Sequence, residues 1–260
     1  MLNQVRHRQL LHLMAERGWH TLVLYGQAWR KDFFRCVVNF GFAGPHAAVV
    51  LSRSGEMRLL ASDPWDAESL AAFGKTAMAH DFAKGLHGLV DGNVAVAGLE
   101  LMEARFAAAL GNAVSATADV EELRRVKTHY ELSCLVRAAE LADRGYAHFA
   151  EVIEEGMAEF ELVAEVEGFL KTNGAEDNFM LIASGGTEVT GMRPPSPDTR
   201  HHASRTPGGR VAHHQIRKRL HNLAGNHGSA PRLGCENLFG NRFAWDFDFR
   251  NGIAHVDVLD

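Results

Sequence analysis

The sequence predicts an α/β fold for residues 1–122, followed by two long amphipathic helices. Three observations support this prediction. Short apolar runs alternate with segments of helical spacing in the first part. Turn signals such as Asp91-Gly92 separate these runs. A helix-start signature at Thr128 then opens a long pattern with helical period. Strands that alternate with helices imply a mixed sheet covered by helices.

The first elements follow from local signals. Residues 5–17 have helical spacing, and Gly18 is a natural helix stop. Residues 21–25 form a strand-like run that is expected to end at Gly26. Residues 36–42 are a second apolar run.

A third apolar run, residues 47–51, leads through Ser54-Gly55 into residues 57–60, which predicts a β-hairpin. Further elements are expected at residues 66–73 (helix), 94–99 (strand) and 101–110 (helix). The alternation of these elements completes the prediction of an α/β domain.

The segment 121–174 has the clearest periodicity. Thr128 followed by Glu131 is a capping box, so His129 and Glu131 are interpreted as helix-start residues rather than as a catalytic pair. One helix is expected to end at Gly156, and a second to cover residues 158–171. The side chains expected to face inward are Leu132, Leu135, Val136, Ala139, Tyr146, Phe149, Ile153, Phe160, Val163, Val166 and Leu170.

Composition excludes several classes of protein. With 46% hydrophobic and 23% charged residues, the 260-residue chain has the composition of a soluble globular protein. A net charge of −5 gives no reason to expect nucleic acid or an acidic membrane as a partner. No apolar run reaches signal-peptide or membrane-spanning length. Cys36, Cys134 and Cys235 are scattered, which favours a cytoplasmic location, and the first two are expected in the core.

The composition changes after Arg200. From Arg200 to Cys235 there are seven Lys or Arg residues and no Asp or Glu. Residues 200–260 carry nine basic and five acidic side chains, a net charge of +4, so residues 1–199 carry −9. Helical and strand periodicity is weak throughout this tail.

Two further features of the tail, its histidine doublets and a cationic run, are candidate binding sites. The doublets His201-His202 and His213-His214 are poor chelates, because adjacent side chains point in different directions. The cationic run Arg217-Lys218-Arg219 has no interleaved aromatic platform for nucleic acid. Solvated histidines and a solvated basic loop are therefore the simpler interpretations.

Several motifs carry a family resemblance. The segment Leu123-Arg124-Arg125-Val126-Lys127-Thr128, with Glu131 and Arg137-Ala138-Ala139, resembles the linker and first catalytic-domain helix of the creatinase and Xaa-Pro aminopeptidase family. Residues 156–162 are similar to the entry of that family's second helix. Ala183-Ser184-Gly185 matches its loop before the active site, and the similarity covers residues 1–196.

The resemblance implies a creatinase-type N-terminal α/β domain (1–122), the first part of a pita-bread α+β catalytic domain (123–199) and an atypical basic, His-rich tail (200–260). Members of the family are metal-dependent hydrolases that act on small peptides, often before proline, or on small amide substrates, and they are commonly homodimers. Their two divalent ions (Mn, Co, Fe or Zn) are held by two Asp, one His and two Glu. Such a pair generates hydroxide and polarises the scissile carbonyl.

The sequence departs from that pattern at the site residues. Met192 occupies the position of the family's substrate-binding histidine, and a thioether donates no hydrogen bond. The first two metal aspartates are expected shortly after Arg200, but the next carboxylate is Glu236. Asp246 and Asp257 are eleven residues apart, as the family's aspartates are. They are either a displaced ligand pair or a coincidence, and the later His and Glu ligands would be absent in both cases.

Two hypotheses for the tail stay open: a frame error near Arg200, or a genuine, diverged C-terminus. The expectation for the chain as given is little or no metal binding or hydrolysis. The alternative function is that of a non-enzymatic remnant of the fold that serves dimerisation or binding.

Overall fold

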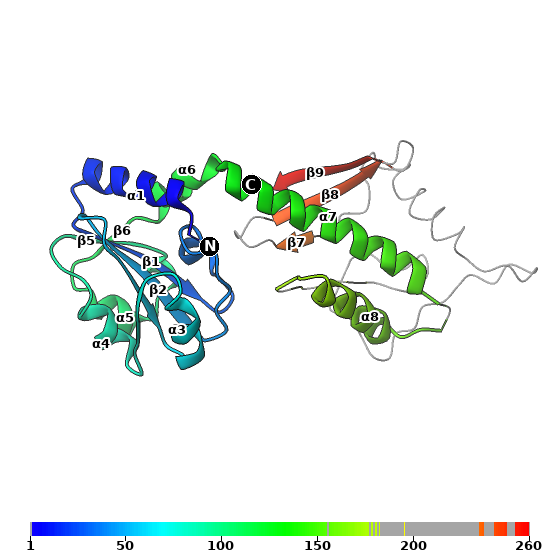
Figure 1. The fold of residues 1–260 in the computed structure, drawn as a ribbon, viewed down its shortest axis with the longest axis horizontal. Helices are drawn as coiled ribbons and strands as arrows, with labels where there is room; N and C mark the ends of the chain where they lie inside the picture. The colour runs from blue at the N-terminus through cyan, green and yellow to red at the C-terminus, as the bar shows by residue number, and fades with distance from the viewer. Residues whose placement is uncertain are drawn as a thin grey trace, which may run out of the picture. The chain divides into compact units, whose positions relative to one another are not determined.

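The computed structural model describes residues 2–154 and 156–176, positions 178, 180, 182 and 195, and the strands at 234–236, 242–248 and 253–259. The chain divides into two compact units. The first unit holds residues 2–132, and the second unit begins at Ser133. Figure 1 labels their helices and strands.

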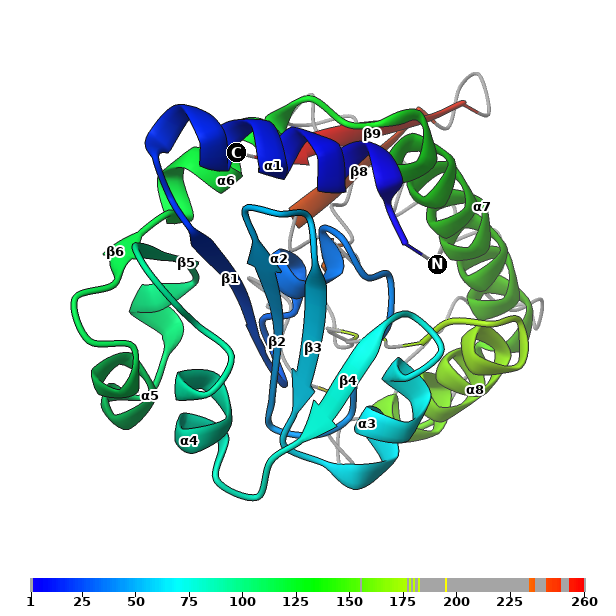
Figure 2. The same ribbon diagram turned by 60° about the vertical axis from the view of Figure 1, so that its left-hand side comes forward.

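The first unit is built on a six-stranded mixed sheet with helices on both faces (Figures 1 and 2). The strands, in the spatial order β4-β3-β2-β1-β5-β6, are β1 (Thr21–Gln27), β2 (His46–Ser52), β3 (Met57–Ala61), β4 (Lys75–Met78), β5 (Val94–Ala97) and β6 (Val114–Ser115). The helices are α1 (Gln4–Arg17), α2 (Asp32–Arg35), α3 (Pro64–Leu70), α4 (Phe82–His87), the 3₁₀ turn η1 (Leu99–Leu101), α5 (Ala104–Ala109) and α6 (Thr117–Arg125). The predicted α/β fold is confirmed.

Strand pairing places β1 at the centre of the sheet. It lies antiparallel to β2, with Leu24 opposite Val49, and parallel to β5, with Leu24 opposite Ala97. Strands β2 and β3 form the predicted hairpin. The remaining pairs, β3 with β4 and β5 with β6, are parallel.

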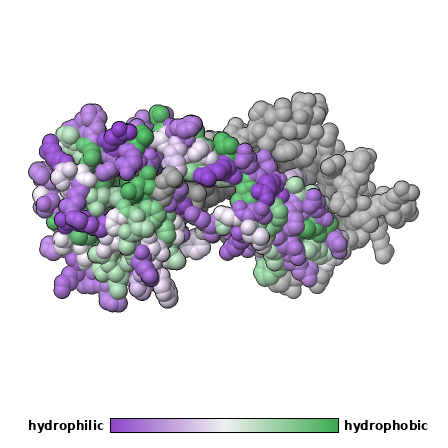
Figure 3. All heavy atoms as spheres, viewed as in Figure 1, coloured by the Kyte–Doolittle hydropathy of each residue, from purple (hydrophilic) through white to green (hydrophobic). Residues whose placement is uncertain are grey.

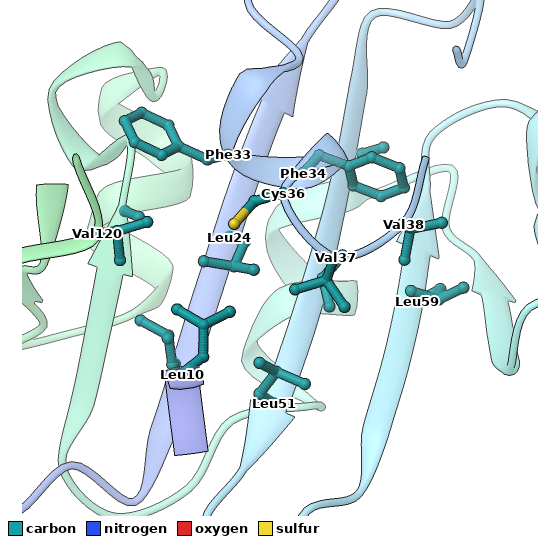
Figure 4. Packing of buried hydrophobic residues seen from close by; sticks show 14 of the residues in the cluster. Leu10, Leu24, Phe33, Phe34, Cys36, Val37, Val38, Leu51, Leu59 and Val120 are labelled. Carbon is teal, nitrogen blue, oxygen red and sulfur yellow. The ribbon is translucent and has the colours of Figure 1, made fainter. Parts of the chain in front are cut away.

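The side chains of β1 alternate between two hydrophobic clusters. Leu22 and Leu24 face the cluster that α1, α2 and α6 cover, whereas Val23 and Tyr25 face the one that α4 and α5 cover. Figure 4 shows Phe34, from α2, above the sheet face of the first cluster. A strand buried on both faces reads as a continuous apolar run, which is why residues 21–25 were recognisable.

Glycines mark two different features here. Gly18 ends α1 in the left-handed conformation, with φ 72°, as predicted. Gly26 does not end β1, which continues to Gln27. A Cβ at Gly26 would lie 3.0 Å from the Cβ of Phe34 and 3.0 Å from Cζ of Phe42. This glycine is therefore required for the close approach of two aromatic side chains rather than for a turn.

The predicted helix pair is confirmed. The helices are α7 (His129–Val152), whose first turn lies in the first unit, and α8 (Glu159–Thr172). They pack closely in the second unit, where the ring of His148 stacks on Phe169 at 4.6 Å between centroids. The second unit also contains a three-stranded antiparallel sheet, made of β7 (Gly234–Glu236), β8 (Arg242–Asp248) and β9 (Ile253–Leu259).

Three of the side chains predicted to face inward are exposed, and those predictions are wrong: Leu132, Val136 and Phe160. In α8 the buried stripe runs through Glu159, Leu162, Val163 and Val166, so Phe160 lies at its flank. Some hydrophobic side chains of these helices are therefore exposed to solvent. Figure 3 shows hydrophobic residues, in green, at the surface of the protein.

Cys36 and Cys134 are buried, as predicted, and both are free thiols. Among the helices described, none combines the length and apolar character needed to cross a membrane.

Candidate functional site

The structure describes some of the site residues predicted from the sequence and not others. Met192 and the histidine doublets lie outside the described residues. Asp246 lies on β8 opposite His255, and Asp257 lies on β9 opposite Ala244. The two aspartates therefore stand on neighbouring strands, two register positions apart, and their role as a ligand pair stays a prediction. Within the part of the chain that the structure describes, no three His, Cys, Asp or Glu side chains group as a metal site.

The first unit contains two clusters of hydrogen-bonded polar side chains that are candidate sites, one fully buried and one that reaches the surface. The first, which we name the junction cluster, consists of Asn3, Arg6, Thr128 and Glu131. All four are buried, and the Arg6 side chain is fully inaccessible to solvent. A buried guanidinium is costly unless each of its five N–H donors finds an acceptor.

Arg6 meets that condition with five hydrogen bonds. Its Nε and Nη2 donate to the two carboxylate oxygens of Glu131, at 3.1 and 2.6 Å. Nη1 donates to Gln9 Oε1 at 2.9 Å and to the carbonyl of Leu123 at 2.6 Å. Nη2 also donates to the carbonyl of Val126 at 2.9 Å. The number of bonds equals the number of donors, so the guanidinium is fully satisfied.

The acceptors of the junction cluster are also helix caps. Glu131 Oε2 accepts from the backbone N–H of Thr128 at 2.7 Å, and Thr128 Oγ1 accepts from that of Glu131 at 3.2 Å. This is the predicted capping box, and the interpretation of Glu131 as a helix-start residue is confirmed. Asn3 Oδ1 caps α1 through the N–H of Arg6. One cluster thus closes the starts of α1 and α7 and the end of α6, so its role is structural.

A largely buried ion pair lies beside this cluster. Arg124 Nη1 donates to Asp32 Oδ2 at 3.0 Å, and its guanidinium lies 5.4 Å from the ring of Phe33. Cys36 is near these charges, yet burial raises the pKa of its thiol to about 12, with Arg124 and Arg6 opposing that shift. The thiol stays protonated at neutral pH and is no nucleophile.

The second cluster, which we name the relay cluster, consists of Tyr25, His46, Glu103 and Arg105. Tyr25 OH lies 2.8 Å from His46 Nδ1, and His46 Nε2 lies 3.0 Å from Glu103 Oε1. Arg105 Nε donates to the other oxygen of Glu103 at 2.7 Å. A chain of hydrogen bonds thus runs from a buried phenol to a carboxylate at the surface.

Burial controls the protonation of this cluster. It raises the pKa of Tyr25 to about 12, and the negative charge of Glu103 acts in the same direction. Burial also lowers the pKa of His46 from its ordinary value of 6.5, with Arg105 acting in the same direction and Glu103 opposing it. Both rings are therefore neutral at pH 7.

The sequence did not reveal the relay cluster. Tyr25 and His46 are brought together by the β1–β2 register, which pairs Tyr25 with Ala48 and Gln27 with His46. Glu103 joins them from the segment before α5. The one local signal is a histidine directly before a buried apolar strand, which is too common to predict a site.

Part of the chain is similar in sequence to known peptidases. No family model matches the sequence. A 68-residue stretch is 40% identical to the Xaa-Pro dipeptidase of Pyrococcus furiosus, covering 25% of this chain and 20% of that protein. A stretch of equal length is 32% identical to the uncharacterized peptidase YqhT of Bacillus subtilis, covering 25% and 19%. The matched stretch thus spans about a fifth of these relatives.

Solved structures match over a longer range. The X-Pro aminopeptidase from Thermotoga maritima MSB8 superposes with a TM-score of 0.63 at 20% identity, over 76% of this chain and 58% of that one. The prolidase from Pyrococcus horikoshii OT3 gives 0.61 at 16% identity, over 77% and 58%. The fold is that of Xaa-Pro peptidases, and the predicted resemblance is confirmed. The similarity extends over less than two thirds of each solved chain.

Proposed function

We propose that this chain has the N-terminal part of an Xaa-Pro peptidase, a metal-dependent type of hydrolase, and that the 260-residue polypeptide does not itself hydrolyse Xaa-Pro peptides. The likeness to Xaa-Pro peptidases supports the first half of the proposal. One observation carries the second half. No Asp or Glu occurs between Arg200 and Cys235, where the resemblance expects two metal-binding aspartates.

The side chains available do not suit a pair of hard divalent ions. Such ions take carboxylate oxygens as ligands. The segment 200–235 instead offers imidazoles and seven cationic side chains, which repel a metal ion. Met192 stands where a histidine would contact the substrate.

The chain is expected to show no turnover of Xaa-Pro dipeptides in the presence of Mn²⁺ or Co²⁺. After dialysis, it should also retain far less than the about two ions per chain that a two-metal site holds. Purified protein is assayed for proline release, and its metal content is measured by mass spectrometry. The Xaa-Pro dipeptidase of Pyrococcus furiosus, assayed alongside, serves as the positive control.

Turnover together with about two bound ions would overturn the proposal, because two-metal hydrolysis needs both. Translating the coding DNA from codon 180 onward in three frames tests the origin of the tail. A second frame that restores aspartates soon after Arg200 would support a frame error. Its absence from all frames would assign the tail to a diverged C-terminus.

A second function, self-association without catalysis, is favoured by two exposed tryptophans. Trp29 and Trp65 are 84% and 76% exposed. Both tryptophans are next in sequence to residues that bind the loop of Gly44 and Pro45. Ala28, which precedes Trp29, donates its N–H to the carbonyl of Pro45, and Asp66, which follows Trp65, accepts from the N–H of Gly44. Exposed aromatic side chains of this kind are typical anchors of protein interfaces.

The chain is accordingly expected to form a homodimer that Trp29→Ser weakens about thirtyfold, since a tryptophan anchor contributes about 2 kcal/mol. Sedimentation velocity over a range of protein concentrations gives the dissociation constant. Phe160→Ser, which removes an exposed aromatic ring from α8, is the matched control and should leave it unchanged. A monomer at all concentrations would contradict this second function.

A further inference from the structure

Helix α7 exposes a row of side chains along one face. The row, which we name the α7 stripe, consists of His129, Leu132, Val136, Glu140 and Asp143, and all five are exposed. Their spacing of three, four, four and three residues places them on one side of a continuous helix. Leu132 is 49% exposed and Val136 is 56% exposed, although both are apolar. Neighbouring apolar side chains between polar ones are typical of the centre of a protein interface.

The opposite side of α7 is the one that packs within the chain. Cys134 is buried there, and a Cβ on Gly145 would lie 2.7 Å from Cδ2 of Leu170 in α8. Cys134 and Gly145 are eleven residues apart, which is about three helical turns, so they lie on the same side of the helix. Since this side packs against α8 at Gly145, the α7 stripe points away from that contact.

Two carboxylates lie at the C-terminal end of the stripe. Glu140 and Asp143 stand three residues apart on the same face. Partial burial raises the pKa of Asp143, and the negative charge of Glu140 acts in the same direction. In the part of the chain that the structure describes, no cation pairs with either carboxylate. A hydrogen-bond donor or a cation from another molecule would therefore stabilise both.

The nearest cations on α7 are directed elsewhere. Arg137 Nη2 donates to Cys134 Sγ at 3.5 Å. Arg144 donates to the side chain of Asn173, which ends α8, and its guanidinium lies 5.7 Å from the ring of Phe169. Both arginines thus serve the packed side of the helix and leave the two carboxylates of the stripe unpaired.

The stripe is complementary to a reversed copy of itself. His129 and Asp143 are each seven residues from Val136, a distance of about 10.5 Å along the helix. In an antiparallel pair with Val136 opposite Val136, each His129 therefore lies beside the partner subunit's Asp143, and an imidazole N–H can donate to a carboxylate. Each carboxylate pair also lies near the positive end of the other helix dipole. Such two-fold contacts are the commonest in homo-oligomers.

We propose that the α7 stripe is a self-association surface, on which a second copy of this chain docks its own α7 in the antiparallel direction about a two-fold axis near Val136. The contact does not use Trp29 or Trp65, so it is separate from the tryptophan surface. One helix of each copy buries less than the roughly 1,600 Å² of a standard interface, so the dissociation constant is expected on the order of 100 µM.

Disulfide trapping in the full chain tests the two-fold axis, with Trp29→Ser as the parent so that the tryptophan surface is weakened. Adding Val136→Cys places two thiols across the axis, where paired helices bring Cβ atoms within disulfide reach. Phe160→Cys replaces a side chain that is 50% exposed on α8 and is the matched control. Under mild oxidation Val136→Cys should form covalent dimer about tenfold faster, because the contact raises the effective thiol concentration. The parent chain measures the contribution of the native cysteines.

A charge exchange tests the ends of the stripe. His129→Asp sets two carboxylates against each other and Asp143→Lys sets a lysine against His129, so each variant alone should dimerise about tenfold more weakly than the parent. An equimolar mixture should recover the parent affinity, because the new carboxylate of one copy faces the new ammonium group of the other. His129→Asp adds an acidic side chain to the first turn of α7, which favours the helix. Sedimentation velocity in the Trp29→Ser parent gives each dissociation constant.

Equal trapping of Val136→Cys and Phe160→Cys would overturn the proposal, because the stripe would then meet a second copy no more often than another exposed position does. A mixture that dimerises no better than its two components would overturn it as well. Either result in a chain that Trp29→Ser weakens as expected would contradict the α7 stripe alone. Efficient trapping at Val136→Cys, in a chain whose association is insensitive to Trp29→Ser, would contradict the tryptophan surface alone.

Discussion

Replacing Arg6 with alanine is expected to lower the free energy of unfolding of the first unit by about 3–5 kcal/mol, because Glu131 would keep a buried charge without its partner. The change also removes the donors that satisfy the carbonyls of Leu123 and Val126. Since domains are typically stable by about 5–15 kcal/mol, a large share of the stability would be lost. Hydrogen exchange of the amides in β1 and β2 measures this loss.

Arg17→Ala is the matched control on the same helix. Arg17 also pairs with a carboxylate across the fold, at 2.5 Å from Asp119, but its side chain is exposed. Exposed pairs contribute about 0–1 kcal/mol. If Arg6→Ala were no more damaging than Arg17→Ala, the junction cluster would not have the structural role assigned to it.

Phe34→Ala is expected to destabilise the first unit by a similar amount, about 3–5 kcal/mol, through lost burial and the cavity that remains. Phe34 is fully buried and meets Phe42 edge-on at 5.1 Å between centroids. Gly26, on the central strand β1, packs closely against the Cβ of Phe34 and the ring of Phe42, so the backbone cannot close the gap without moving that strand. Exchange of the β1 amides should accelerate by about two to four orders of magnitude, at about 1.4 kcal/mol per tenfold.

Val126→Ala provides the comparison for this effect. It removes apolar atoms from a side chain that is 79% exposed, so the expected change is within about 0.5 kcal/mol. Equal effects of the two variants would mean that the cluster around Phe34 is not the core of the unit.

Features with a local signal were predictable from the sequence. The hairpin of β2 and β3 follows from two apolar runs around a Ser-Gly turn, and the start of α7 follows from Thr128 and Glu131, three residues apart. Each signal lies within a few residues, where the chemistry of a turn or a cap is decided. The family resemblance was recognisable for the same reason, since its motifs are short.

Features that join distant residues were not predictable. Arg6 and Glu131 are 125 residues apart, and nothing near Arg6 indicates that its charge will be buried. Tyr25, His46 and Glu103 meet only after the sheet has formed. The inward face of α8 was missed by a small rotation, because Phe160 is apolar and the buried Glu159 beside it is not. Periodicity places a stripe on a helix but does not fix its edges.

The junction cluster has a consequence for the order of events during synthesis. Arg6 leaves the ribosome 125 residues before the carboxylate that neutralises it. At about 5–20 residues per second, that delay is roughly 6–25 seconds. Throughout it, α1 carries a charge that the finished domain buries completely, so docking of α1 onto the sheet is unfavourable. The growing chain is thereby kept from completing its first unit until the opening turn of the next helix has emerged.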